Sequence, residues 1–214
     1  MMGGLIRVRR WKFLRLQKRR KLCYNVAMNI HAKMPSTSEE FLRWNEGREG
    51  KREFVHGRVV EMMIHVTRDH YYLASRLWLQ LSSQLGLKEY IVGSADFGVK
   101  TGHGVRYPDI LVEKSGGAGK ELATEKPLLI AEVLSPSTMA DDFGPKAQEY
   151  LSISSLRHYL ILSQDESRIW VWSRDADDIW VGPEIFAGLE ASVLLNGFGI
   201  TVSLDEVYSG IVGS

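Results

Sequence analysis

Apolar residues recur at three- and four-residue spacing between residues 68 and 85, the strongest periodic pattern in the chain. The recurring positions are Tyr72, Leu73, Leu77, Leu81 and Leu85. This spacing places the side chains on one face of an α-helix, and Gly86 follows where the pattern stops. We therefore predict an amphipathic helix over residues 68–85.

A short helix and a hairpin are predicted before this long helix. Residues 52–55 and 58–62 are two runs of strand length, and the pair at 56–57 between them favours a turn. A helix is expected to begin at Glu39, with a capping side chain within residues 36–38.

The rest of the chain alternates between apolar runs of strand length and shorter helical patterns. Strands are predicted at 90–93, 96–100, 107–113, 128–134, 157–162, 169–172 and 179–181. Further helices are predicted around 139–151 and over 204–211. The order from residue 68 to 162 is an αβββαβ core, flanked by an N-terminal helix and hairpin and a C-terminal antiparallel meander. This order indicates an α/β (α+β) fold, a mixed sheet with helices on its faces.

The net charge of +1 conceals an uneven distribution. Residues 1–33 hold ten Lys or Arg and no Asp or Glu, so 17 basic residues face 26 acidic ones in the rest, a net charge of −9. We expect a basic, ill-ordered extension over 1–33 and one domain over 34–214. The extension could instead be an arm that contacts nucleic acid or an anionic surface. Met28 and Met34 are alternative start positions.

Cysteine content and hydropathy indicate the compartment. Cys23 is the only cysteine, which excludes an internal disulfide and favours a reducing environment. No apolar run approaches the roughly 20 residues needed to cross a bilayer, and none has the form of a secretory signal. We expect a cytoplasmic protein with no membrane partner.

Two runs of strand length each carry one carboxylate. Asp109 follows Pro108 at the start of the run 107–113, and Glu132 interrupts the otherwise apolar run 128–134. An ionised carboxylate in a central strand is costly unless it is paired or binds a metal. Two carboxylates on adjacent strands suit a hard divalent ion such as Mg²⁺, and Lys146 in the helical pattern that follows could stabilise an oxyanion or position a water.

These residues belong to a wider resemblance between this chain and a known family. The matching motifs are residues 52–59, Tyr107-Pro108-Asp109-Ile110, the run Glu132-Val133-Leu134-Ser135-Pro136-Ser137-Thr138, and Asp142, Lys146 and Tyr150. Together they resemble the large bacterial family of Uma-type restriction endonucleases, within the PD-(D/E)XK nuclease superfamily. The resemblance covers roughly residues 36–212.

The resemblance implies a restriction-endonuclease-like core in which Asp109 and Glu132 bind Mg²⁺ (or Mn²⁺) on neighbouring strands. The superfamily places a lysine two positions after the Glu, where this chain has Leu134, and Lys146 is the candidate replacement. Glu53 would be an additional catalytic acid. The implied activity is metal-dependent hydrolysis of phosphodiester bonds. DNA is the expected nucleic-acid partner, and a homodimer would suit cleavage of a duplex.

Each assignment has an alternative that the sequence leaves open. Asp109 could pair with Arg106 or Lys114, and Glu132 could form a buried ion pair with Lys146 that needs no metal. Two further residues could join the site or serve the fold alone, namely Glu53 and His70. Three aromatic residues could stack on bases or pack in the core, namely Trp170, Trp172 and Trp180.

A different class of function is also open. Leu134 in place of the usual lysine favours a catalytically silent nuclease-fold module that binds a protein partner or nucleic acid, and such a module would not need a divalent ion at Asp109 and Glu132. The acidic body counts against tight duplex binding, although a local basic groove could form from Lys100, Arg106, Lys114 and Lys120. The chain has no zinc-spaced His or Cys pair, no Gly-x-Ser-x-Gly elbow and no phosphate loop.

Overall fold

The structure is a computed structural model that describes residues 33–62, 65–135 and 138–211. The chain from Met34 onward forms one unit by its mutual contacts. Within the described ranges, no helix combines the length and the apolar character needed to cross a membrane. The basic extension was expected over 1–33, and all of it except Lys33 lies outside the described residues.

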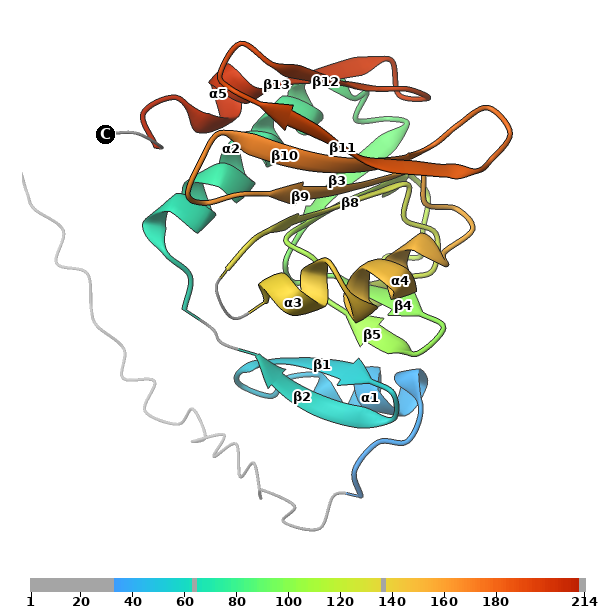
Figure 1. The fold of residues 1–214 in the computed structure, drawn as a ribbon. Coiled ribbons are helices and arrows are strands. Elements are labelled where there is room, and N and C mark those ends of the chain that lie inside the picture. Colours follow the sequence, from blue (N-terminus) through green and yellow to red (C-terminus); the bar gives the residue numbers. More distant parts are fainter. Residues whose placement is uncertain (1–32, 63–64, 136–137, 212–214) are drawn as a thin grey trace, which may run out of the picture. The chain divides into compact units, whose positions relative to one another are not determined.

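The described residues form five helices and thirteen strands (Figure 1). The helices are α1 (Ser38–Asn45), α2 (Arg68–Gln84), α3 (Met139–Asp142), α4 (Pro145–Leu151) and α5 (Leu204–Tyr208). The first seven strands are β1 (Lys51–Val55), β2 (Arg58–Met62), β3 (Tyr90–Ser94), β4 (Gly98–Thr101), β5 (Gly104–Arg106), β6 (Ile110–Lys114) and β7 (Ala123–Thr124). The other six are β8 (Leu129–Val133), β9 (His158–Leu162), β10 (Arg168–Arg174), β11 (Trp180–Ala187), β12 (Ser192–Leu195) and β13 (Ile200–Ser203).

Six strands form the central sheet, in the order β11-β10-β9-β8-β6-β3. Neighbouring strands are antiparallel except for β8 and β9, which are parallel. A parallel pair needs a crossover connection, and α3 and α4 lie in the connection between these two strands (Figure 1). The predicted mixed sheet with a C-terminal antiparallel meander is confirmed.

The central strands bury side chains on both faces of the sheet. Val112 packs with Leu77 of α2 on one face, and Ile130 packs with Tyr150 of α4 on the other. Because side chains alternate along a strand, Glu132 shares the α4 face with Ile130. All five residues of β8 are buried, so this carboxylate has little access to solvent.

A second sheet has the order β2-β1-β5-β4-β7. The predicted hairpin forms its edge, and α1 covers part of it because Phe41 stacks on Phe54 with ring centroids 5.5 Å apart. Thr37 caps α1, since its hydroxyl accepts a hydrogen bond from the backbone N–H of Glu40 at 3.1 Å.

The structure differs from the predicted elements in two places. The helix expected around 139–151 is two helices, because Pro145 begins α4 and a Cβ on Gly144 would lie 2.5 Å from the carbonyl oxygen of Ala140. Strands β5, β7, β12 and β13 were not predicted, because two to four residues are too short to carry a clear alternation.

Gly104, which pairs with Val55 where β5 meets β1, tolerates no side chain. A Cβ there would lie 1.7 Å from the carbonyl oxygen of Phe54, a backbone atom that cannot rotate away. We expect Gly104→Ala to lower the free energy of unfolding by about 3 kcal/mol, measured by urea denaturation. Gly102→Ala is the control, because nothing lies within 4 Å of its Cβ position; equal stability of the two variants would contradict the β1–β5 contact.

Candidate functional site

The register of two antiparallel strands brings the two candidate carboxylates together. Ile110 of β6 pairs with Ala131 of β8, so one step further along the same register places Asp109 beside Glu132. The backbone N–H of Val133 donates to Oδ2 of Asp109 at 2.9 Å, which confirms that the two segments remain in contact beyond the ladder.

Asp109 is held in its ionised form. Its Oδ2 accepts from Val133 and lies 3.1 Å from Nε2 of His70 on α2. Burial by itself would raise the pKa of Asp109, but His70, the Val133 N–H and the nearby ammonium of Lys51 outweigh burial and lower the pKa below its usual range. At neutral pH the carboxylate is therefore charged, as a metal ligand must be.

Glu132 is only 4% exposed, and two donors bind one of its oxygens. Nζ of Lys146 lies 2.8 Å from Oε1 of Glu132, and the hydroxyl of Tyr150 donates to the same oxygen at 3.0 Å. The ammonium of Lys146 also donates to Oδ1 of Asp142 at 3.1 Å. The buried Glu132–Lys146 ion pair, one of the alternatives left open by the sequence, is present.

This buried cluster contains more carboxylates than cations. Burial raises the pKa of Glu132, and the carboxylates of Asp109 and Asp142 raise it further against the opposing effect of Lys146. Burial would lower the pKa of Lys146, but Glu132, Asp142 and Glu53 outweigh burial and raise it, so the amine is protonated. A divalent cation would relieve the repulsion between such carboxylates.

Arg106 on β5 binds carboxylates from three other elements. Its guanidinium contacts both oxygens of Glu149 at 3.0 and 2.7 Å, Oε2 of Glu53 at 2.9 Å and Oδ2 of Asp141 at 3.2 Å. The other oxygen of Glu53 accepts from the backbone N–H of Tyr107 at 3.1 Å. Glu53 therefore has both oxygens bound.

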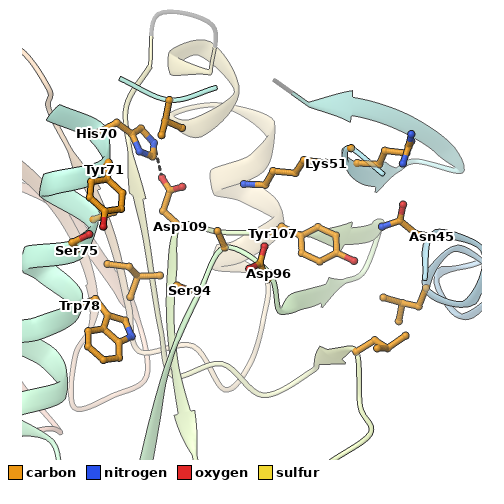
Figure 2. A pocket seen from close by; sticks show the side chains of 18 of the residues that line it. Asn45, Lys51, His70, Tyr71, Ser75, Trp78, Ser94, Asp96, Tyr107 and Asp109 are labelled. Atoms are coloured by element: carbon orange, nitrogen blue, oxygen red, sulfur yellow. Dashed lines mark ion pairs between the residues drawn. The ribbon is translucent and has the colours of Figure 1, made fainter. Parts of the chain in front are cut away.

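Asp109 lies on the wall of a cavity of about 870 Å³ (Figure 2). The α2 wall carries His70, Tyr71, Ser75 and Trp78, and the opposite wall carries Asn45, Lys51 and Tyr107. The side chain of Asp109 is 13% exposed. The cavity thus gives a ligand a path to this carboxylate.

The donor atoms suit a hard divalent cation. Oδ2 of Asp109 and Oε1 of Glu132 take part in the contacts above, while the second oxygen of each carboxylate accepts no hydrogen bond from the described residues. Mg²⁺ is commonly held by one or two carboxylates and completes its shell with water and substrate oxygens. The described residues contain no group of three or more His, Cys, Asp or Glu that could hold a metal ion.

The family model for Uma2, described as "Putative restriction endonuclease", matches residues 38–205. The chain belongs to the Uma2 family. Two curated relatives come from Synechocystis sp. The "Uncharacterized protein slr1290" is 27% identical over 192 residues, which is 87% of this chain and 98% of the relative. The "Uncharacterized protein sll1609" is 27% identical over 154 residues, 70% of this chain and 86% of the relative.

A solved structure shares the fold. The chain described as a "putative nuclease belonging to DUF820" from Anabaena variabilis matches with a TM-score of 0.64 at 18% identity, over 82% of this chain and 98% of that chain. The restriction-endonuclease-like fold expected from the sequence is thereby confirmed. Uma2 membership and this fold together support a nuclease-like function.

The residues predicted from the Uma2 motifs are placed as follows. Asp109 and Glu132 lie beside each other, and Lys146 reaches Glu132 from α4. Leu134, in the position of the usual lysine, is buried in the core on the α4 face. Glu53 lies in the adjoining Arg106 network, close enough to affect the pKa of Lys146.

The two alternative partners of Asp109 that the sequence left open bind other carboxylates. Asp109 pairs with His70 and not with Arg106 or Lys114, because Arg106 is bound by its own carboxylates. Sequence reasoning left open whether His70 belongs to the site, and it did not single out Lys51. The latter could have been found, since it precedes Glu53 by two residues and alternate residues of a strand share a face.

Three of the four cations considered for a local basic groove are held in ion pairs, and Lys120 has none among the described residues. Ion pairs occupy three of them: Lys100 with Glu39 and Glu125, Lys114 with Glu89, and Arg106 with the carboxylates described above. Three tryptophans pack against the core on the α4 face: Trp170, Trp172 and Trp180. Three of the four cations and all three tryptophans therefore have partners among the described residues.

Proposed function

We propose that this chain is a metal-dependent endonuclease that hydrolyses phosphodiester bonds in DNA. Asp109 and Glu132 would bind Mg²⁺ or Mn²⁺, and Lys146 would be the active-site lysine. The observation that carries the proposal is the meeting of these three groups, from β6, β8 and α4, in a member of the Uma2 family.

The residues of the chain have distinct roles in this proposal. A bound divalent ion would lower the pKa of the attacking water, and its positive charge would stabilise the leaving oxygen. Lys146 stays protonated and can donate to the water or to a phosphate oxygen that gains charge. Tyr150 holds one oxygen of Glu132, and His70 holds one oxygen of Asp109, so the second oxygen of each carboxylate is available to a cation.

Glu53 has a positioning role in the proposal. Both of its oxygens are bound, by Arg106 and by the backbone of Tyr107, so a metal ligand would have to give up one of these contacts. Its charge instead supports the protonated form of Lys146. Arg106 in turn joins Glu53 of β1 to Glu149 of α4, which fixes the helix that carries Lys146.

Divalent-ion binding is the first test. At a hundredfold excess of Mg²⁺ or Mn²⁺ over its dissociation constant, binding to the folded state adds about 2.7 kcal/mol, which should raise the melting temperature by roughly 5–10 °C. Plasmid DNA should be nicked in the same buffer and remain intact with EDTA. A metal-independent melting temperature together with intact plasmid would reject the proposal.

A catalytically silent module is the alternative function. Two observations favour it: Lys146 and Tyr150 bind one oxygen of Glu132, and Leu134 occupies the usual lysine position. Such a module would bind its partner equally well in EDTA and would keep that binding in Asp109→Asn.

A further inference from the structure

The cavity beside Asp109 exposes aromatic side chains that the core does not use. Tyr71 is 60% exposed and Trp78 is 40% exposed, and both line the cavity from α2. The core-facing residues of α2 form a different stripe, which includes Leu73 and Leu77. These two aromatic residues therefore form a second, solvent-facing stripe on the same helix.

The aromatic residues stand on two walls of the cavity. Nε1 of Trp78 donates to the carbonyl oxygen of Val92 at 2.9 Å, which anchors the indole by one edge. Tyr107 lines the opposite wall (Figure 2). A cavity of about 870 Å³ is in the range that encloses drug-sized ligands, and a nucleotide is of that size.

The cavity is also lined by a cation that has no ion-pair partner among the described residues. Lys51 reaches from β1 toward Asp109 (Figure 2), and its charge acts on that carboxylate. In contrast to Lys100, Lys114 and Arg106, it forms no ion pair with any described residue. Its ammonium is therefore available to a phosphate.

The negative net charge of residues 34–214 disfavours binding of a duplex through its phosphate backbone. Tight duplex binding needs many Lys and Arg contacts to phosphate, but residues 34–214 carry a net charge of −9 and three of the cations considered above are paired. Stacking of bases on aromatic side chains is a source of affinity that needs few cations.

We propose that the cavity binds an unpaired nucleotide of the strand being cut, with its base against Trp78, Tyr71 and Tyr107 and its phosphate at Lys51, beside Asp109. The inference rests on the proposed function, and it names the substrate class: single-stranded or locally unpaired nucleic acid. A paired base could not enter, because stacking inside the cavity requires that the base leave the duplex.

Binding of the full chain to labelled oligonucleotides in EDTA tests this inference without cleavage. We expect an oligo-dT of twelve nucleotides to bind at least tenfold more tightly than a duplex of the same length, measured by fluorescence anisotropy. An oligo-U arm distinguishes DNA from RNA. The basic N-terminal segment is present in every variant, so differences between variants report on the cavity.

Three substitutions locate the binding. Trp78→Ala should weaken oligo-dT binding about tenfold or more, because one stacked base contributes about 1–3 kcal/mol, while Trp78→Phe should retain most of it. Lys51→Met should reduce the slope of log K against log salt by about 0.7, the value of one phosphate contact on a single strand. Leu79→Ala, an exposed residue of α2 outside the cavity, is the matched control.

The outcomes separate this inference from the proposed function. Equal affinity for the duplex, or a Trp78→Ala variant that stays folded and binds as wild type does, would overturn the inference. If Trp78→Ala fails to fold, Tyr71→Ala gives the same test at a more exposed position. Cavity-dependent binding without any metal-dependent cleavage would reject the endonuclease proposal and leave the nucleotide site standing.

Discussion

Asp109→Asn is expected to lower metal-dependent DNA cleavage on the order of 10³-fold, because it removes a charged ligand whose metal contributes several kcal/mol to transition-state stabilisation. The side chain keeps its shape, and an amide oxygen can still accept the N–H of Val133. The fold should therefore survive while the affinity for Mn²⁺ falls. Initial rates of plasmid nicking and calorimetric Mn²⁺ binding measure the two effects.

Asp177→Asn is the matched control for this variant. Asp177 is an exposed carboxylate between β10 and β11, remote in the chain from the cluster, and the same loss of charge there should change the rate by less than about twofold. Retention of full cleavage by Asp109→Asn would remove Asp109 from the metal site. Loss of cleavage in both variants would indicate a general effect of charge on DNA binding.

Lys146→Met is expected to abolish most cleavage and also to destabilise the protein. Without the ammonium, Glu132 and Asp142 are left as buried carboxylates with no cation at hydrogen-bond distance, which costs about 3–5 kcal/mol when both are ionised. Cleavage should fall by roughly 10²–10³-fold, the typical loss for one group that stabilises the transition state. Thermal unfolding and nicking rates check the two effects.

The loss of stability in Lys146→Met should depend on pH. A carboxyl group whose pKa is raised on folding stabilises the protein fully below its unfolded pKa, which is 4.5 for a glutamate, and loses that contribution as pH rises through the folded pKa. Removal of Lys146 raises the folded pKa of Glu132 further. The difference in melting temperature between wild type and variant should therefore be small near pH 5 and grow toward pH 8.

Lys126→Met controls for the loss of a lysine at an exposed position and should leave both measurements near wild type. A Lys146→Met variant that is as stable as wild type at pH 8 would contradict the buried ion pair. A stable variant that also cleaves at the wild-type rate would remove Lys146 from the catalytic group.

Much of the secondary structure followed from local patterns, although β11 runs to Ala187 and was predicted only over 179–181. The helix at 68–85 and the strands around Asp109 and Glu132 were predicted because burial on one face imposes a period that a short window of sequence displays. The break between α3 and α4 was missed, although Gly144 and Pro145 marked it. Strand β5 has three residues, and its pairing with β1 depends on a distant segment.

The candidate site was only partly visible in the sequence. Glu132 stood out because it is the one charged residue in an otherwise apolar run, and the motif around Asp109 identified its neighbour. The contacts that complete the site come from segments far apart in the chain, since His70 reaches Asp109 from α2 and Lys51 faces it from β1. Nothing in the local sequence indicated that aromatic residues on the exposed side of α2 would line a cavity.

The sequence by itself determined the fold class and the resemblance to the Uma-type family, and it supplied Asp109, Glu132 and Lys146 as the candidate site residues, because periodicity, composition and motif spacing are properties of short stretches. Only the tertiary structure decided which groups surround them. It paired Arg106 with Glu53 rather than with Asp109, and it placed Lys51 at a cavity with no ion-pair partner in the part of the chain that the structure describes. Side-chain partners depend on strand order and register, and these are set by burial and hydrogen bonding across the whole chain.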